Sequence, residues 1–478
     1  MSDALPDATV AHQPAAAEAG VFKGRLAKLV VKLLSGRIST PEAYWQLELD
    51  LLALERDLQS AITRRKAVAD ARERGKDLDH LRQALWHARR FGDALAWTLF
   101  RAQRRQLYPL SENHRTPVLP DGDGSRGMIA GAQGLYEQLG FPLLHDITDL
   151  LRVGDVTFFE RDGLPQTVEI KTQVVDSKSD GKNTMMTYRV TVIAPSDGIP
   201  PAHNSATTSS RSPATQPALA SERFHRQLKR MTEARAIATA EIGKPAEIAG
   251  VKTLMIEGVD KPAGSRWPLL RRLVRRAKQT GYASGVADDE VLLAAIYDES
   301  GIDSSNPGFK QIRRDLLGSG IFLGDREKND LLVSSLPDSR GNGPHRYVPY
   351  YLYSLPRTAI VDMLFGRLVI ISVLNAGKVV AALEDAGLRI QLGAKRSIRV
   401  FTEIQAHGGR YQVELPSLQE NLTEMIMEAM PISYVVGMAV AMAKGAAEQA
   451  PLVLRDPRDA TVWSSPTAGR HADRVRGH

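Results

Sequence analysis

Residues 153–173 read VGDVTFFERDGLPQTVEIKTQ, with two β-rich runs on either side of an Asp-Gly turn. This arrangement predicts a β-hairpin, because Asp-Gly suits the tight turns that join antiparallel strands. Side chains alternate between the two faces of a strand, so Glu169, Lys171 and Gln173 are expected on one face. With the Asp-Gly turn as the pivot, Asp155 lies opposite Glu169. Two carboxylates and a lysine would then converge on one rigid sheet, a pattern typical of a divalent-metal site.

Composition and simple motifs exclude several classes of protein. The chain has 478 residues, which suggests two or three domains. It has no cysteine, which excludes disulfide frameworks, thiolate zinc sites and cysteine nucleophiles. Residues 122–125 (GDGS) are not followed by Gly-Lys-Ser/Thr, so a nucleotide-hydrolysing phosphate loop is not expected. The apolar stretch 429–443 is too short for an ordinary membrane span, and no secretory signal is recognisable, so we expect a cytoplasmic protein without a membrane partner.

Positive charge is concentrated near the N-terminus. The net charge is +7 and the pI is near 9.4, which suggests a polyanionic partner. Between Gly20 and Tyr108 there are 18 Lys and Arg against 10 Asp and Glu, a larger excess than that of the whole chain. Apolar residues recur at helical spacing here, so residues 21–125 are predicted to form a basic helical region. Its basic residues are either the solvated face of a bundle or an arm along nucleic-acid phosphates.

Residues 126–262 are expected to follow the order helix, strand, strand, strand, helix, strand. These elements are predicted at residues 128–139, 153–159, 167–173, 185–193, 221–240 and 250–257. The second helix bears Arg226 and Gln227. The Ser/Thr/Pro-rich segment 195–220 is interpreted as a low-complexity insertion.

Asp155 followed by Glu169-Ile170-Lys171, inside this order of elements, resembles the PD-(D/E)xK restriction-endonuclease-like nuclease superfamily. The Gly-Asp-Val opening of the first strand and the Arg226-Gln227 helix resemble its Holliday-resolvase and Mrr-like branches. The resemblance implies an α/β nuclease core of order αβββαβ, in which helices flank a central mixed sheet. One departure is that no proline precedes Asp155. The long insertion before the second helix is also unusual.

The family resemblance also implies roles for individual residues. Asp155, Glu169 and the backbone carbonyl of Ile170 would bind Mg²⁺ or Mn²⁺, which neutralises phosphate charge and makes bound water more acidic. Lys171 would orient or activate the attacking water. The auxiliary residues that it implies are Gln173 and Gln227 near the metal or phosphate, Arg226 beside them, and Glu137 as an extra carboxylate on the first helix.

We therefore predict a metal-dependent endo- or exonuclease that hydrolyses phosphodiester bonds of nucleic acid, with DNA as the expected substrate. By analogy with the family, phage defence or DNA processing is the expected setting, with a homo-oligomer or a defence-system protein as partner. The alternative is a non-catalytic nucleic-acid-binding or assembly subunit that retains the nuclease fold. In a purely structural interpretation, Asp155 caps a strand end, and Glu169 pairs with Lys171 on an exposed face.

The remaining regions carry weaker functional signals. Residues 1–20 and 451–478 are predicted to be disordered tails. Residues 263–450 are expected to form a mixed α+β C-terminal region of unknown role. Within it, residues 287–297 and 418–446 are predicted to be helices. Residues 266–278 are predicted to be a basic amphipathic helix, which is either docked on the surface or a dedicated groove binder.

Overall fold

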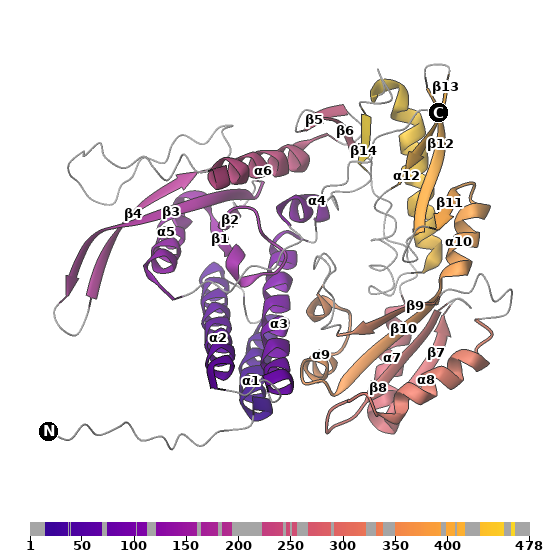
Figure 1. Ribbon diagram of the computed structural model, residues 1–478, viewed down its shortest axis with the longest axis horizontal. Helices are drawn as coiled ribbons and strands as arrows, with labels where there is room; N and C mark the ends of the chain where they lie inside the picture. Colours follow the sequence, from indigo (N-terminus) through magenta and orange to yellow (C-terminus); the bar gives the residue numbers. More distant parts are fainter. Residues whose placement is uncertain are drawn as a thin grey trace.

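The computed structural model describes residues 15–36, 38, 40–68, 74–101, 103–111, 121–159, 164–179, 184–193, 222–241, 245–248, 251–255, 266–287, 291–321, 331–337, 349–392, 398–406, 409–415, 431–453 and 460–463 (Figure 1). The low-complexity insertion predicted at residues 195–220 lies outside these ranges.

The described chain is a mixed α/β protein with several small sheets. The α-helices are α1 (Ala15–Leu34), α2 (Pro41–Val68), α3 (Arg74–Leu99), α4 (Arg104–Leu107), α5 (Asp123–Leu139), α6 (Glu222–Thr239), α7 (Trp267–Thr280), α8 (Pro307–Gly318), α9 (Arg357–Leu364), α10 (Ala376–Asp385) and α12 (Ile432–Val453). The 3-10 helices are η1 (Tyr108–Leu110), η2 (His145–Ile147) and η5 (Tyr350–Leu352).

The described strands belong to four sheets, in which strands named one after another are neighbours. The first contains β1 (Phe141–Leu144), β2 (Val156–Phe159), β3 (Gln166–Ser179) and β4 (Thr184–Ile193). The second contains β7 (Tyr282–Ala287), β8 (Val291–Tyr297), β10 (Leu368–Asn375) and β9 (Leu331–Leu336). The third contains β11 (Arg389–Leu392), β12 (Ile398–Ala406) and β13 (Gly409–Glu414), and the fourth β14 (Ala460–Trp463), β6 (Val251–Met255) and β5 (Pro245–Ile248).

Helices α1, α2 and α3 pack against one another as a bundle (Figure 1). Helix α1 begins at Ala15, so the tail predicted over residues 1–20 is wrong for its last six residues. Two contacts explain this helical start. Glu18 pairs with Arg64 and Arg65 of α2, and Ala19 is buried in the core.

The first sheet contains the predicted hairpin and is antiparallel throughout. Strand β1 was not expected, because a proline at position 142 normally argues against a strand. Pro142 is tolerated because β1 forms the edge of the sheet, where a missing N–H costs no ladder hydrogen bond. Strands β2 and β3 pair with Val156 opposite Val168, as the hairpin prediction requires.

The mixed central sheet expected for an αβββαβ core is absent from the described residues. The fourth strand of that order forms as β6, but it pairs with β5 on one edge and with β14 on the other. Because a strand has only two edges, β6 has none left for β1–β4. The prediction of individual elements was therefore better than the prediction of how they assemble.

Helix α3 holds the turn that precedes β2. The Asp93 carboxylate accepts hydrogen bonds of 2.8 Å from the backbone N–H groups of Asp149 and Leu150. Arg89 donates to the carbonyls of Asp146 and Thr148 at 2.7 and 2.8 Å. These groups are buried, so the helical region and the hairpin share one packed core across the boundary predicted at residue 125.

Helices α7 and α8 cover opposite faces of the second sheet. Val291, Leu293 and Ala295 of β8 belong to the hydrophobic cluster that contains the apolar face of α7. The alternate residues Leu292, Ala294 and Ile296 pack with Ile312 of α8. The helix predicted at residues 287–297 is therefore wrong. A strand buried on both faces has a continuous apolar run, which periodicity cannot distinguish from a buried helix.

The C-terminal segment also differs from expectation. Helix α12 (Ile432–Val453) overlaps the helix predicted over residues 418–446 and extends beyond its predicted end, while residues 418–430 lie outside the described part. Residues 460–463 form β14, so the tail predicted at 451–478 contains a strand. The pairing of β14 with β6 explains why residues 460–463 adopt a regular structure. Every helix within the described ranges is too short or too polar to cross a lipid bilayer.

Gly92 gives a stability prediction for the α3–η2 contact. A Cβ at Gly92 would lie 1.8 Å from the Ile147 carbonyl oxygen. The Ile147 carbonyl belongs to the backbone and cannot rotate away as a side chain could. Gly92→Ala should therefore lower the free energy of unfolding by more than about 3 kcal/mol in urea denaturation. Gly134→Ala is the matched helical control. It has open space at the Cβ and should raise that free energy by about 0.5–1 kcal/mol. Equal effects of the two substitutions would contradict this account.

Candidate active site

The hairpin brings Asp155 and Glu169 together. The ladder of β2 and β3 ends at the pair Val156 and Val168, and Asp155 lies just before it, with its carboxylate close enough to Glu169 for the two charges to interact. The backbone N–H of Asp155 donates to the Val168 carbonyl at 2.9 Å, and the Asp155 carboxylate accepts a 2.8 Å hydrogen bond from the N–H of Ile170. Main-chain atoms of β3 therefore fix both the backbone and the side chain of Asp155.

Gly154 makes this close approach possible. Its φ of +77° lies in the left-handed region, and a Cβ would come within 2.9 Å of the Val168 carbonyl oxygen and 3.2 Å of the Met231 sulfur. Proline fixes φ near −65°, so it cannot adopt this conformation. Position 154 therefore could not be occupied by proline in this backbone conformation.

The turn between β1 and β2 is held beside the site by a network of hydrogen bonds. His145 Nε2 lies 2.7 Å from Thr157 Oγ1, which in turn lies 2.8 Å from Thr167 Oγ1. The His145 backbone N–H donates to the Asp155 carbonyl at 3.0 Å. Burial lowers the pKa of His145 to about 3, so this imidazole is neutral at physiological pH. The network supports the site without adding charge to it.

The electrostatic environment of Asp155 is unusual for an aspartate. Burial, and after it the charge of the Glu169 carboxylate, together raise its pKa to about 7, against the hydrogen bond from Ile170 N–H and the charge of Lys171. A pKa near neutrality means that the free site resists carrying two negative charges. Such a pair of carboxylates is suited to a positively charged ligand.

Lys171 pairs with Glu169. Its ammonium group contacts Glu169 Oε1 from two residues along the same face of β3. The Glu169 side chain is 8% exposed, whereas that of Lys171 is 43% exposed. The carboxylate is therefore held inside the site, and the ammonium group lies where a ligand from solvent can reach it.

Asp146 is a third carboxylate that the sequence reasoning missed. It lies in η2, and its pKa is raised by burial and by the charge of Glu169, against the effects of Arg89, Arg152 and Arg56. Its only signal in the sequence is its place directly after the apolar run of β1, which was not predicted to be a strand. Asp146 contributes negative potential to the same site.

The predicted auxiliary residues are placed less clearly. Gln227 is half-buried on α6, with its side-chain oxygen unsatisfied within the described structure. Arg226 and Glu137 are on α6 and α5, and no described interaction links either to the carboxylates. Gln173 lies on β3 opposite Arg189, but its side chain lies outside the described part. The N–H of Ile170 donates to Asp155, whereas the role of its carbonyl as a metal ligand stays a prediction.

The donor set fits a hard divalent cation bound by two carboxylates. Mg²⁺ prefers oxygen ligands and commonly uses one or two carboxylates together with water. A cation would also supply the charge that the high pKa of Asp155 shows to be lacking. Among the described residues there is no group of three or more His, Asp or Glu side chains arranged to hold a metal. The binding of a cation would therefore depend on the carboxylates of Asp155 and Glu169, and Asp146 is not counted among its ligands.

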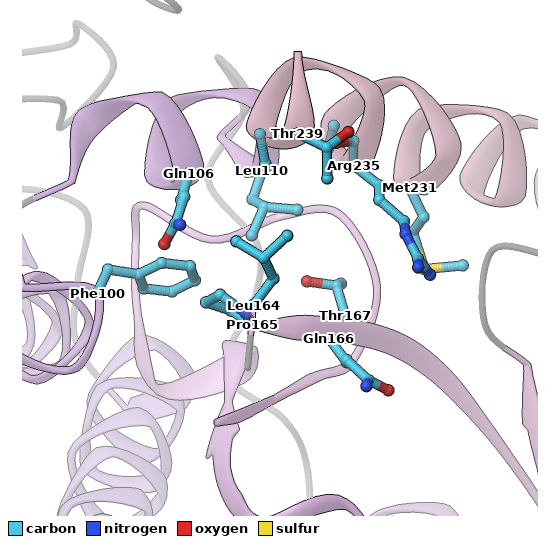
Figure 2. Close-up of a pocket in the computed structure, with 12 residues that line it drawn as sticks. Phe100, Gln106, Leu110, Leu164, Pro165, Gln166, Thr167, Met231, Arg235 and Thr239 are labelled. Carbon is cyan, nitrogen blue, oxygen red and sulfur yellow. The ribbon is translucent and has the colours of Figure 1, made fainter. Parts of the chain in front are cut away.

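A pocket of about 270 Å³ lies between α6 and the turn end of the hairpin, and neither Asp155 nor Glu169 lines it (Figure 2). Thr167 lines it and shares a face of β3 with Glu169, two residues further along the strand. The other walls combine apolar residues such as Phe100 and Met231 with polar residues such as Arg235. Its volume is slightly below the range of drug-sized sites.

A scan against protein-family models, a search of curated proteins and a search of solved structures each found no match to this chain.

The Asp155 environment predicts a pH dependence of stability. Without metal, the folded state holds the Asp155 proton up to about pH 7, whereas the unfolded chain releases it near pH 4. Stability should therefore fall as the pH rises through this window. An asparagine side chain has no proton to release, so Asp155→Asn should be more stable than the wild type by about 2–4 kcal/mol at pH 8 and no more stable at pH 4.

Urea unfolding in EDTA at pH 4, 6 and 8 measures this difference. Asp57→Asn removes an exposed carboxylate that pairs with Arg25, and its stability should run parallel to that of the wild type. Parallel curves for Asp155→Asn and the wild type would contradict the proposed environment.

Proposed function

We propose that this chain is a metal-dependent nuclease that hydrolyses phosphodiester bonds, with DNA as the expected substrate. The observation that carries the proposal is the closeness of the Asp155 carboxylate to Glu169, with Lys171 bound to Glu169. Two carboxylates and an ammonium group gathered at one place on a sheet suit metal-assisted phosphoryl chemistry. A cytoplasmic setting in phage defence or DNA processing, with an oligomeric or defence-system partner, extends the proposal by family analogy.

Each residue then has a distinct task. Asp155 and Glu169 hold Mg²⁺ or Mn²⁺, which when bound polarises the phosphate and acidifies water. The hydrogen bond from Ile170 N–H fixes one oxygen of Asp155, so the carboxylate is oriented before a cation arrives. Lys171, tethered to Glu169 and partly exposed, donates to the attacking water or to the phosphate oxygens.

The pocket at the turn end of the hairpin would suit part of a polymer substrate. Thr167 in its wall lies on the same sheet face as Glu169, about 7 Å along the strand from it. A nucleobase next to the scissile phosphate would fill such an apolar space, in the way that bases bind against aromatic and apolar walls. A free phosphate ester would leave it empty.

The second candidate is a non-catalytic nucleic-acid-binding or assembly subunit. Two observations favour it: the strand that should complete the nuclease sheet pairs elsewhere, and the described residues contain no three-ligand metal group. In that case Asp155 and Glu169 would remain a buried structural pair. The two candidates make opposite predictions for metal-dependent cleavage.

A cleavage assay tests the proposal. Plasmid, linear duplex, single-stranded DNA and RNA are incubated with Mg²⁺ or Mn²⁺ and the purified chain. Cleavage of at least one substrate is expected, and Asp155→Asn, Glu169→Gln and Lys171→Met should each lower its rate by about 100-fold or more. Asp57→Asn serves as the control, since its carboxylate lies on the exposed face of α2, and it should cleave like the wild type.

The folding of each variant is checked by circular dichroism and urea unfolding. Failure of the folded wild type to cleave any substrate with either metal would overturn the proposal. So would cleavage that persists in the Asp155 and Lys171 variants.

A further inference from the structure

Helix α7 displays four arginines on one face. Arg271, Arg272, Arg275 and Arg276 are all exposed, and their spacing places them in one stripe along the helix. The helix sequence WPLLRRLVRRAKQT contains no acidic residue. Like charges four residues apart destabilise a helix slightly, so the stripe weakens α7 instead of stabilising it.

The rest of the structure holds this helix firmly. Leu270, Leu273, Val274 and Ala277 form its buried face and pack on strands β7 and β8. Gly281 ends the helix in the left-handed conformation, and its N–H bonds to the Ala277 carbonyl. The arginine stripe therefore projects from a rigid platform.

The four guanidinium groups have no ion pair within the described residues. Some other cations are paired: Lys278 on the same helix pairs with Asp362, and in the N-terminal bundle Arg25 pairs with Asp57 and Arg89 with Glu55. Packing explains the apolar face of α7, but no contact among the described residues explains its charged face.

The chemistry of the stripe favours a nucleic-acid backbone over other anions. Guanidinium groups bind phosphates through paired N–H donors, and four of them need a partner with repeated negative charge. Helices that bind membrane surfaces insert an apolar face among the lipids, and the apolar face of α7 is already packed inside the protein. A helix of 14 residues extends about 21 Å, which matches about six base-pair steps.

We propose that the arginine stripe of α7 binds the phosphate backbone of nucleic acid outside the carboxylate site. The stripe contacts phosphates and not base edges, so it contributes affinity without sequence preference. The choice of nucleic acid as the bound polymer rests on the proposed nuclease function. The binding itself requires neither metal nor cleavage.

The test measures binding without cleavage. Fluorescence anisotropy of a labelled DNA duplex and a single strand is followed in EDTA from about 50 to 300 mM NaCl, with the full-length chain. Replacing all four arginines by glutamine should weaken binding at least about tenfold at the lowest salt. The slope of log K against log salt for the duplex should become flatter by about 2–4, because each lost phosphate contact removes about 0.9 from it.

A matched control lies on the opposite face of the same sheet. Lys310, Arg313 and Arg314 of α8 are exposed cations, and their triple replacement by glutamine should change the slope by less than about 1. Equal slope changes in the two variants would show a general charge effect and overturn the proposal. So would an α7 variant that keeps its thermal stability and the wild-type slope.

Two further outcomes separate this inference from the proposed function. If the wild type binds DNA through α7 but cleaves nothing, the nuclease proposal fails and the inference stands. If it cleaves DNA, and the α7 variant cleaves with an unchanged KM at about 150 mM salt, the inference fails alone. Binding to phosphatidylserine vesicles that depends on the stripe, without any to DNA, would assign the surface to membranes and overturn it.

Discussion

The candidate site depends on the contact between helix α3 and the turn before β2. Gly92 lets the helix backbone touch the Ile147 carbonyl, and the next residue, Asp93, caps two N–H groups of the same turn. Burial raises the pKa of Asp93 to about 6, although its bond to Arg90 opposes the change. Buried charges of this kind are stable only when fully bonded, so the contact is intolerant of small displacements.

This contact fixes the position of the candidate site. Asp146 and His145 belong to this turn, and Asp155 is joined to it by the hydrogen bond from His145 N–H. The N-terminal helices therefore hold the carboxylate pair in position, in addition to carrying positive charge. Arg89 illustrates the point, since it is buried against Glu55 and the turn carbonyls and is unavailable to phosphates.

Local patterns in the sequence were sufficient for the hairpin and its paired carboxylates. The period-two alternation of the two strands determines which side chains share a face, and it does not depend on distant residues; the predicted Asp-Gly turn itself lies outside the described residues. Strand β8 was misread because burial on both faces removes the periodic signal. The partners of β6 could not be predicted, since β14 lies far along the chain, at residues 460–463. Asp146 was missed because its role arises from burial beside Glu169, which no spacing encodes.

The parallel pairing of β6 with β14 also has a consequence for biosynthesis. Residues 460–463 leave the ribosome long after residues 251–255, by about 10–40 s at ordinary rates of translation. During that interval one edge of β6 lacks its final neighbour and can pair with the strand of another nascent chain. Contacts so distant in sequence also form slowly. The yield of correctly assembled protein should therefore depend on how well chaperones shield this edge while the C-terminal half is being made.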